Sequence, residues 1–158
     1  MSKVIMFDMD GVILDSLNLY YLTWKRISEE LNAKVKIDSV EKYKKLFKNN
    51  IFEMLKTIGL TEKEGDKTKE LYLETLKENP PKIFEGIKEV INELSKKYTL
   101  AIVSGSLKEA VDGILKEEDL TDFFKVVIPI LEPSKNKPNP YHVNLAIEKL
   151  NVDPKEII

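Results

Sequence analysis

The chain has 158 residues, of which 42% are hydrophobic and 33% charged, and a formal net charge of −2. A chain of this kind forms one well-packed core with room for a small inserted module, and it offers no basic field for nucleic acid. The chain has no cysteine, which excludes disulfides, zinc–thiolate sites and thiol nucleophiles. It also has no signal pattern and no apolar run long enough to cross a bilayer, so we expect a cytoplasmic protein without a membrane partner.

The first predicted element is a buried strand over residues 3–7 (KVIMF), whose continuous apolar run is typical of a parallel sheet covered on both faces. The strand leads directly into Asp8, Asp10, Gly11 and Asp15. Clustered carboxylates beside a buried strand are costly unless a cation or another partner neutralises them. Asp15 is the exception, because it is expected to act as a structural cap or a hinge residue where the following helical segment begins, and not as a catalyst.

Residues 17–81 carry only helix signals. Helices are predicted over 17–31, over 39–58 with a break near Asn49 and Asn50, and from Thr61 to about residue 78. Thr61 and Glu64 have the spacing of a capping box, and the double proline at 80–81 ends the last helix. The pattern indicates an all-helical module over residues 16–81, inserted after the first strand.

Strand and helix alternate after the double proline. Helices are predicted over 85–97, from a Ser106–Glu109 capping box onward, and over 140–150, and strands over 99–103 and 125–131, the latter interrupted by Pro129. Residues 153–158 (DPKEII) indicate the start of a fourth strand. The predicted fold class is therefore α/β, with a parallel sheet and a helical insertion.

Polar residues follow the ends of the predicted strands, where open parallel sheets bind ligands. The first strand delivers Asp8 and Asp10, the second Ser104, and the loop after the third Lys137. Mg²⁺ is the natural partner for the two acids, because it takes carboxylate and carbonyl oxygens and keeps waters and substrate phosphate in its other positions. Gly11 permits a tight turn in which backbone amides approach a phosphate. The constellation indicates phosphoryl transfer.

Each of these residues also has a purely structural interpretation. Aspartates after a strand commonly form turns or caps, and Ser104 with Gly105 is ordinary punctuation between a strand and a helix. Lys137 by itself is one of many solvated lysines, and only its K-P-x-P context distinguishes it. His142, the sole histidine, is predicted to be a partly exposed helix residue and not a ligand or base. The functional interpretation depends on the combination.

Three motifs, in this order, resemble the haloacid dehalogenase-like hydrolase superfamily. They are D-x-D-G-V-x-x-D-S starting at Asp8, an apolar strand ending in Ser104, and K-P-x-P starting at Lys137. The resemblance covers essentially the whole chain and is to the phosphatase and phosphoglucomutase-like branch, whose helical cap follows the first motif. It implies a Rossmann-like core of residues 1–15 and 82–158 and a cap of residues 16–81.

The resemblance also implies a role for each site residue. Asp8 would be the nucleophile that forms an aspartyl-phosphate and gives a carboxylate oxygen to Mg²⁺. Asp10 would be the general acid and base, with its backbone carbonyl as a second metal ligand. Ser104 and the amide of Gly105 would hold phosphoryl oxygens, and Lys137 would neutralise charge. The implied activity is a Mg²⁺-dependent phosphatase acting on a small phosphorylated metabolite.

Two features depart from the family pattern. Tyr141 stands where relatives often have aspartate, which should affect only the start of the helix. The fourth motif, which supplies further metal-binding acids after another strand, is absent: the chain ends at Ile158, and Asp153 lies in a turn before that strand. We therefore expect a core truncated at its C-terminal strands, as a monomer or as a homodimer paired through the incomplete sheet edge. A phosphomutase and a non-catalytic phosphate-binding remnant remain alternatives.

Overall fold

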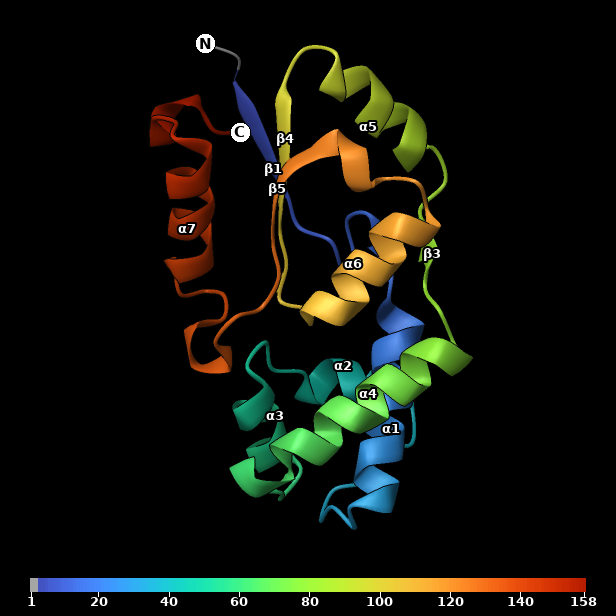
Figure 1. Ribbon diagram of the computed structural model, residues 1–158. Helices are drawn as coiled ribbons and strands as arrows, with labels where there is room; N and C mark the ends of the chain where they lie inside the picture. The colour runs from blue at the N-terminus through green and yellow to red at the C-terminus, as the bar shows by residue number, and fades with distance from the viewer. Residues whose placement is uncertain (1–2) are drawn as a thin grey trace. The chain divides into compact units, whose positions relative to one another are not determined.

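The computed structural model of the chain describes residues 3–158 (Figure 1). Its helices and strands are, in chain order, β1 (Val4–Phe7), β2 (Leu14–Asp15), α1 (Leu17–Glu30), α2 (Val40–Leu46), α3 (Ile51–Thr57), α4 (Gly65–Glu78), β3 (Lys82–Ile83), α5 (Ile87–Ser95), β4 (Thr99–Val103), α6 (Lys108–Glu117), β5 (Phe124–Ile128) and α7 (Tyr141–Leu150). Short 3-10 turns occur at Glu62–Glu64, Thr121–Phe123, Pro133–Lys135 and Pro154–Glu156. The chain divides into two compact units: the N-terminal segment up to Asp15 together with Ile83–Ile158, and Ser16–Lys82.

The first unit is built on a parallel sheet in the order β1-β4-β5, which confirms the predicted α/β class. Val4 to Phe7 of β1 pair with Thr99 to Ile102 of β4, whose Val103 pairs in turn with Ile128 of β5. β5 ends at Ile128, shorter than predicted, because Pro129 has no N–H to donate to a neighbouring strand.

The last residues of the chain pair with the side of β1 away from β4. Ile157 forms a parallel bridge with Val4, and the amide of Ile158 donates to the carbonyl of Val4 at 2.8 Å. The amide of Met6 donates to the carbonyl of Ile158 at 3.1 Å. These contacts agree with the prediction that a further strand starts here, and they place β1 between two partners.

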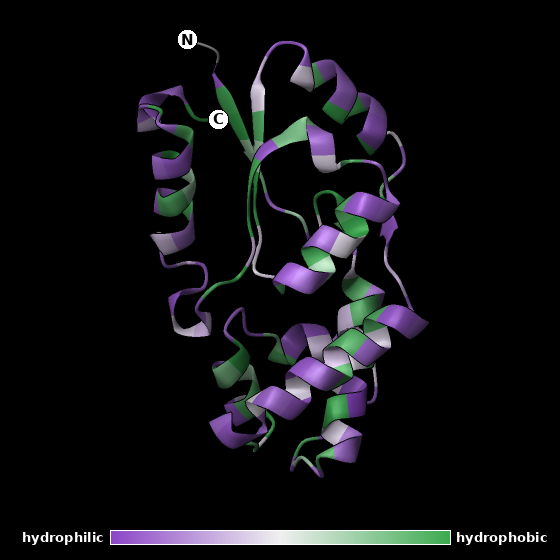
Figure 2. Cartoon of the chain, in the orientation of Figure 1, coloured by the Kyte–Doolittle hydropathy of each residue, from purple (hydrophilic) through white to green (hydrophobic). Residues whose placement is uncertain are grey.

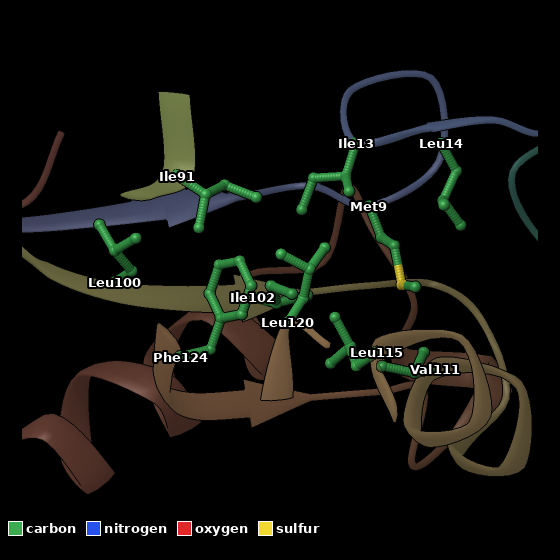
Figure 3. Packing of buried hydrophobic residues seen from close by; sticks show 10 residues of the cluster. All are labelled: Met9, Ile13, Leu14, Ile91, Leu100, Ile102, Val111, Leu115, Leu120 and Phe124. Atoms are coloured by element: carbon green, nitrogen blue, oxygen red, sulfur yellow. The ribbon is translucent and has the colours of Figure 1, made fainter. Parts of the chain in front are cut away.

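Helices cover both faces of this sheet, α5 and α6 on one face and α7 on the other (Figure 1). Successive residues of β4 point to opposite faces of the sheet. Leu100 and Ile102 pack against the α5–α6 layer, and Ala101 packs against α7. The larger cluster consists of Met9, Ile13, Leu14, Ile91, Leu100, Ile102, Val111, Leu115, Leu120 and Phe124 (Figure 3). Most residues of β1, β4 and β5 are hydrophobic, whereas the helices alternate hydrophobic with hydrophilic residues (Figure 2). Burial on two sides explains the continuous apolar runs of the strands.

A second sheet, made of β2 and β3, was not predicted from the sequence. Two residues are too short to show a periodicity, so the sequence carried no signal for either strand. Asp15 is exposed and belongs to β2, so it does not cap α1, and its alternative role as a hinge residue stays a prediction. The N-cap position is Ser16, one residue later, and the side chain of Ser16 makes no capping hydrogen bond.

The second unit consists of α1 to α4, and no strand lies within residues 16–81, all of which the structure describes. The predicted break in the second helix is a true boundary, because the side chain of Asn50 accepts from the amides of Phe52 and Glu53 and caps α3. The predicted capping box of Thr61 and Glu64 is present. In the part of the chain described, no helix has the length and apolar character needed to cross a membrane.

Candidate active site

The register of the parallel sheet brings the first and second motifs to one edge. β1 ends at Phe7 and β4 at Val103, so Asp8 and Ser104 are the residues that follow the two strand ends. Because Phe7 pairs with Ile102, Asp8 lies level with Val103. Asp10 lies beyond β1, where it forms an isolated bridge with Leu14 across the turn of residues 11–13.

Lys137 reaches this edge from the loop after β5. Its Nζ lies 2.9 Å from Oδ1 of Asp8 and donates to the carbonyl oxygen of Val103 at 3.2 Å. The two side chains of the ion pair are 32% and 44% exposed, so the pair contributes at most about 1 kcal/mol to stability. Oδ1 of Asp8 also accepts from the amide of Met9 at 2.7 Å. An exposed pair of this kind does little for the fold, but it brings an ammonium group to the carboxylate that follows β1.

The loop that carries Lys137 is fastened to the loop after β4. The amide of Ile130 donates to the carbonyl of Ser106 at 2.9 Å, and the amide of Lys137 donates to Oδ1 of Asn136 at 2.8 Å. A Cβ atom on Gly105 would lie 3.2 Å from Oδ1 and 3.3 Å from Nδ2 of Asn136. Glycine at position 105 therefore allows the two loops to approach each other closely. Sequence reasoning missed Asn136, because a single asparagine in a polar loop carries no signal of its own.

The hydroxyl of Ser104 is buried, with 1% of the residue exposed. Its amide donates to the carbonyl of Ile128 at 2.8 Å, and its Oγ accepts from the amide of Ser106 at 3.0 Å. Oγ of Ser106 donates to Oδ2 of Asp10 at 2.6 Å. Ser104 is thus joined to Asp10 through Ser106.

The predicted capping box of Ser106 and Glu109 was wrong. α6 begins at Lys108, its N-cap position is Leu107, and no side chain caps its start. Ser106 lies one residue too early for a cap, and its hydroxyl is directed to Asp10 instead. The same S-x-x-E spacing suits either use, so the sequence alone could not distinguish them.

Gly11 makes the tight turn that was predicted, with a φ of +77° that favours glycine. We expected backbone amides of this turn to approach a phosphate, but three of them form hydrogen bonds within the turn instead. The amide of Gly11 donates to the carbonyl of Leu14 at 2.8 Å, and those of Ile13 and Leu14 donate to the carbonyl of Met9. These three groups are used to close the turn, which orients the segment that carries Asp10.

His142 is buried, with 1% of the residue exposed, so its predicted partial exposure was wrong. It shares the inner face of α7 with Ala146 and Leu150, one helical turn apart each. Its Nε2 accepts from the amide of Leu131 at 3.1 Å. Burial lowers the pKa of His142, an effect that the charge of Glu132 opposes.

A metal ion at this edge would have to rely on few protein ligands. Within residues 3–158, no group of three or more His, Cys, Asp or Glu side chains is arranged to hold a metal. Mg²⁺ commonly uses only one or two carboxylates, with waters and substrate phosphate in its other positions. The exposed carboxylate of Asp8, together with the backbone carbonyl expected from Asp10, fits such a partly hydrated ion.

A parallel α/β sheet with two acids, a hydroxyl and a lysine at the carboxyl ends of its strands has the chemical groups of an enzyme site at the edge where such sheets bind ligands. The family model of the haloacid dehalogenase-like hydrolases matches residues 5–158. The chain therefore belongs to the haloacid dehalogenase-like hydrolase family, as the three motifs predicted.

The named relatives that the chain resembles include a phosphatase and a phosphomutase. The phosphorylated carbohydrates phosphatase of Thermotoga maritima is 25% identical, in an alignment that covers 99% of this chain and 74% of the relative. The β-phosphoglucomutase of Bacillus subtilis is 24% identical, over 98% of this chain and 72% of the relative. The fold is similar to that of CbbY from Rhodobacter sphaeroides in complex with phosphate, with a TM-score of 0.79, 19% identity, and coverage of 100% of this chain and 76% of the other.

Proposed function

We propose that the chain is a Mg²⁺-dependent phosphatase that hydrolyses a small phosphorylated metabolite through an aspartyl-phosphate on Asp8. The observation that carries the proposal is the position of Lys137, whose Nζ lies 2.9 Å from Oδ1 of Asp8. An ammonium group there neutralises the carboxylate as an anionic phosphate approaches it, which removes the main obstacle to attack by one anion on another.

The proposed reaction has two steps. A carboxylate oxygen of Asp8 attacks phosphorus, the bond from phosphorus to the ester oxygen breaks, and Asp10 gives its proton to the departing alkoxide. Water then attacks the same phosphorus, Asp10 takes a proton from that water, and the bond from Asp8 to phosphorus breaks. Asp8 and Asp10 return to their initial states, and the products are an alcohol and inorganic phosphate.

The remaining site residues act on charge and position. Ser104 and the amide of Gly105 would hold phosphoryl oxygens, with Ser104 presented by the end of β4. Mg²⁺, held by the carboxylate of Asp8 and the backbone carbonyl of Asp10, would neutralise charge on the phosphoryl group. We also propose that the helical unit over residues 16–81 acts as a cap that selects the substrate. Relatives named for phosphorylated carbohydrates and for phosphoglucomutase support a phosphorylated sugar or a similarly small ester.

The test is hydrolysis of p-nitrophenyl phosphate and of a panel of sugar phosphates, with and without Mg²⁺. The wild type is expected to release phosphate, and D8N to lose at least about 10³-fold in kcat because no aspartyl-phosphate forms. D112N is the matched control, since Asp112 forms an exposed ion pair with Lys108 within α6. Turnover by D8N equal to that of the wild type would refute the proposal.

A phosphomutase is the second candidate, favoured by the similarity to a β-phosphoglucomutase. In that reaction the aspartyl-phosphate passes its phosphoryl group to a sugar phosphate instead of to water. Product analysis with glucose 1-phosphate distinguishes the two, because a mutase yields an isomeric sugar phosphate whereas a phosphatase yields free sugar and phosphate. Binding of phosphate without turnover in either assay would identify a non-catalytic phosphate-binding protein.

A further inference from the structure

Ser106 makes a contact that the proposed reaction has not used. Its Oγ donates to Oδ2 of Asp10 at 2.6 Å, within the range of hydroxyl–carboxylate hydrogen bonds, which are about twice as strong as neutral ones when the acceptor is ionised. Ser106 is 6% exposed, so water competes little for this hydroxyl. The bond joins the loop after β4 to the turn after β1, two segments that lie 96 residues apart in the sequence.

The backbone of Ser106 is held on both sides. Its amide donates to Oγ of Ser104 at 3.0 Å, and its carbonyl accepts from the amide of Ile130 at 2.9 Å. These bonds anchor Ser106 to the residue that follows β4 and to the loop that carries Lys137. The hydroxyl is therefore set in place before any substrate arrives, which is the condition for a group that orients a reacting side chain.

Ser106 is not the N-cap residue of the following helix. α6 begins at Lys108 after an N-cap at Leu107, and no side-chain capping bond is made there. The remaining structural explanation is that the bond only fastens the turn after β1. Closure of that turn already comes from its own backbone bonds, made by the amides of Gly11 and Leu14.

We propose that Ser106 is a positioning residue for Asp10, an inference that rests on the acid–base role proposed for Asp10. The carboxyl group of Asp10 cannot rotate about its Cβ–Cγ bond without losing the hydrogen bond from Ser106. The hydroxyl thus sets the orientation in which Asp10 meets the ester oxygen and the attacking water. The amide of Ser106 also donates to Oγ of Ser104. One short segment therefore positions both the hydroxyl proposed to bind phosphate and the proposed acid–base group. Small displacements of such groups lower the reaction rate strongly.

Kinetics of S106A, S106T and S95A with p-nitrophenyl phosphate test this role. We expect S106A to lower kcat about tenfold or more with KM within about twofold, because the orientation of Asp10 affects the reacting atoms more than substrate binding. S106T, which keeps a hydroxyl, is expected to recover most of kcat. S95A is the matched control, because Oγ of Ser95 donates to a backbone carbonyl at the end of α5. Unchanged kcat in S106A overturns the proposal, as does a joint loss of kcat and thermal stability that S106T does not restore.

Crystal structures of the wild type and S106A separate this inference from the proposed function. A wild type that hydrolyses no phosphate ester refutes the proposed function, whereas the orientation of Asp10 can be compared in any case. A rotated or disordered carboxyl group in S106A supports the positioning role. An Asp10 side chain that keeps its wild-type orientation in S106A overturns it.

Discussion

Gly105 offers a sharp test of how closely the two loops of the site must approach. In G105A the new Cβ would lie 3.2 Å from Oδ1 and 3.3 Å from Nδ2 of Asn136, closer than ordinary contact, so Asn136 must move by a few tenths of an ångström. Oδ1 of Asn136 accepts a hydrogen bond from the amide of Lys137 at 2.8 Å, and Nζ of Lys137 lies 2.9 Å from Oδ1 of Asp8. The displacement is therefore passed on to the ammonium group at the reacting carboxylate.

The size of the effect follows from opposing contributions. Overpacking costs about 1–3 kcal/mol in a rigid core, and the lower end applies here because Asn136 is only partly buried in a loop. Replacing glycine by alanine restricts the unfolded chain, which recovers about 0.4–1 kcal/mol where the backbone conformation tolerates a side chain. The net loss of stability should be small, about 1 kcal/mol or less. Misplacement by about 1 Å costs about 10²-fold in rate, so a smaller shift should cost several-fold to tenfold in kcat/KM.

G113A is the matched control for G105A. Gly113 lies inside α6, and a Cβ there would meet nothing within 4 Å. Alanine is favoured over glycine in a helix by about 0.5–1 kcal/mol, so G113A should raise Tm by roughly 1–4 °C and leave kcat/KM unchanged. Both variants would be measured with p-nitrophenyl phosphate and by thermal unfolding. Wild-type kcat/KM in G105A, or an equal loss in both variants, would refute the reasoning.

Three further predictions concern Lys137, His142 and Asn50. K137M should lower kcat/KM by about 10²-fold or more while changing the free energy of unfolding by less than about 1 kcal/mol, because the ion pair with Asp8 is exposed; a large loss of stability with full activity would contradict this. The pKa of His142 is lowered by burial, so below about pH 6.5 the unfolded chain binds a proton that the folded chain does not, and stability falls as the pH falls. Urea unfolding from pH 7.5 to 5 should show a smaller loss for H142Q than for the wild type, and parallel curves would count against the assignment. N50A should destabilise the protein by about 1 kcal/mol, and N50D much less, because the side-chain oxygen of Asn50 caps α3; equal midpoints for the two variants in urea would disprove the cap.

The strands that the sequence predicted well are those with nearly continuous apolar runs. β1 and β4 lie between two helical layers, so every residue except Thr99 is apolar and the run is visible without knowledge of the partners. The helix breaks at Asn50 and Thr61 were visible because caps use neighbours only two or three residues away. β2 and β3 are two residues long, and only their pairing makes them strands.

The site divides in the same way. The sequence by itself determined which chemical groups the chain possesses and that Asp8, Asp10 and Ser104 follow strand ends, because the carboxyl ends of parallel strands share one edge. Tertiary structure alone decided that Ser106 bonds to Asp10 instead of capping a helix, and that His142 is buried. Hydrogen bonds of a side chain depend on which distant segment lies within 3 Å, whereas secondary structure depends mainly on near neighbours. The hydrogen-bond partner of a side chain such as Ser106 is therefore known only once the tertiary structure is known.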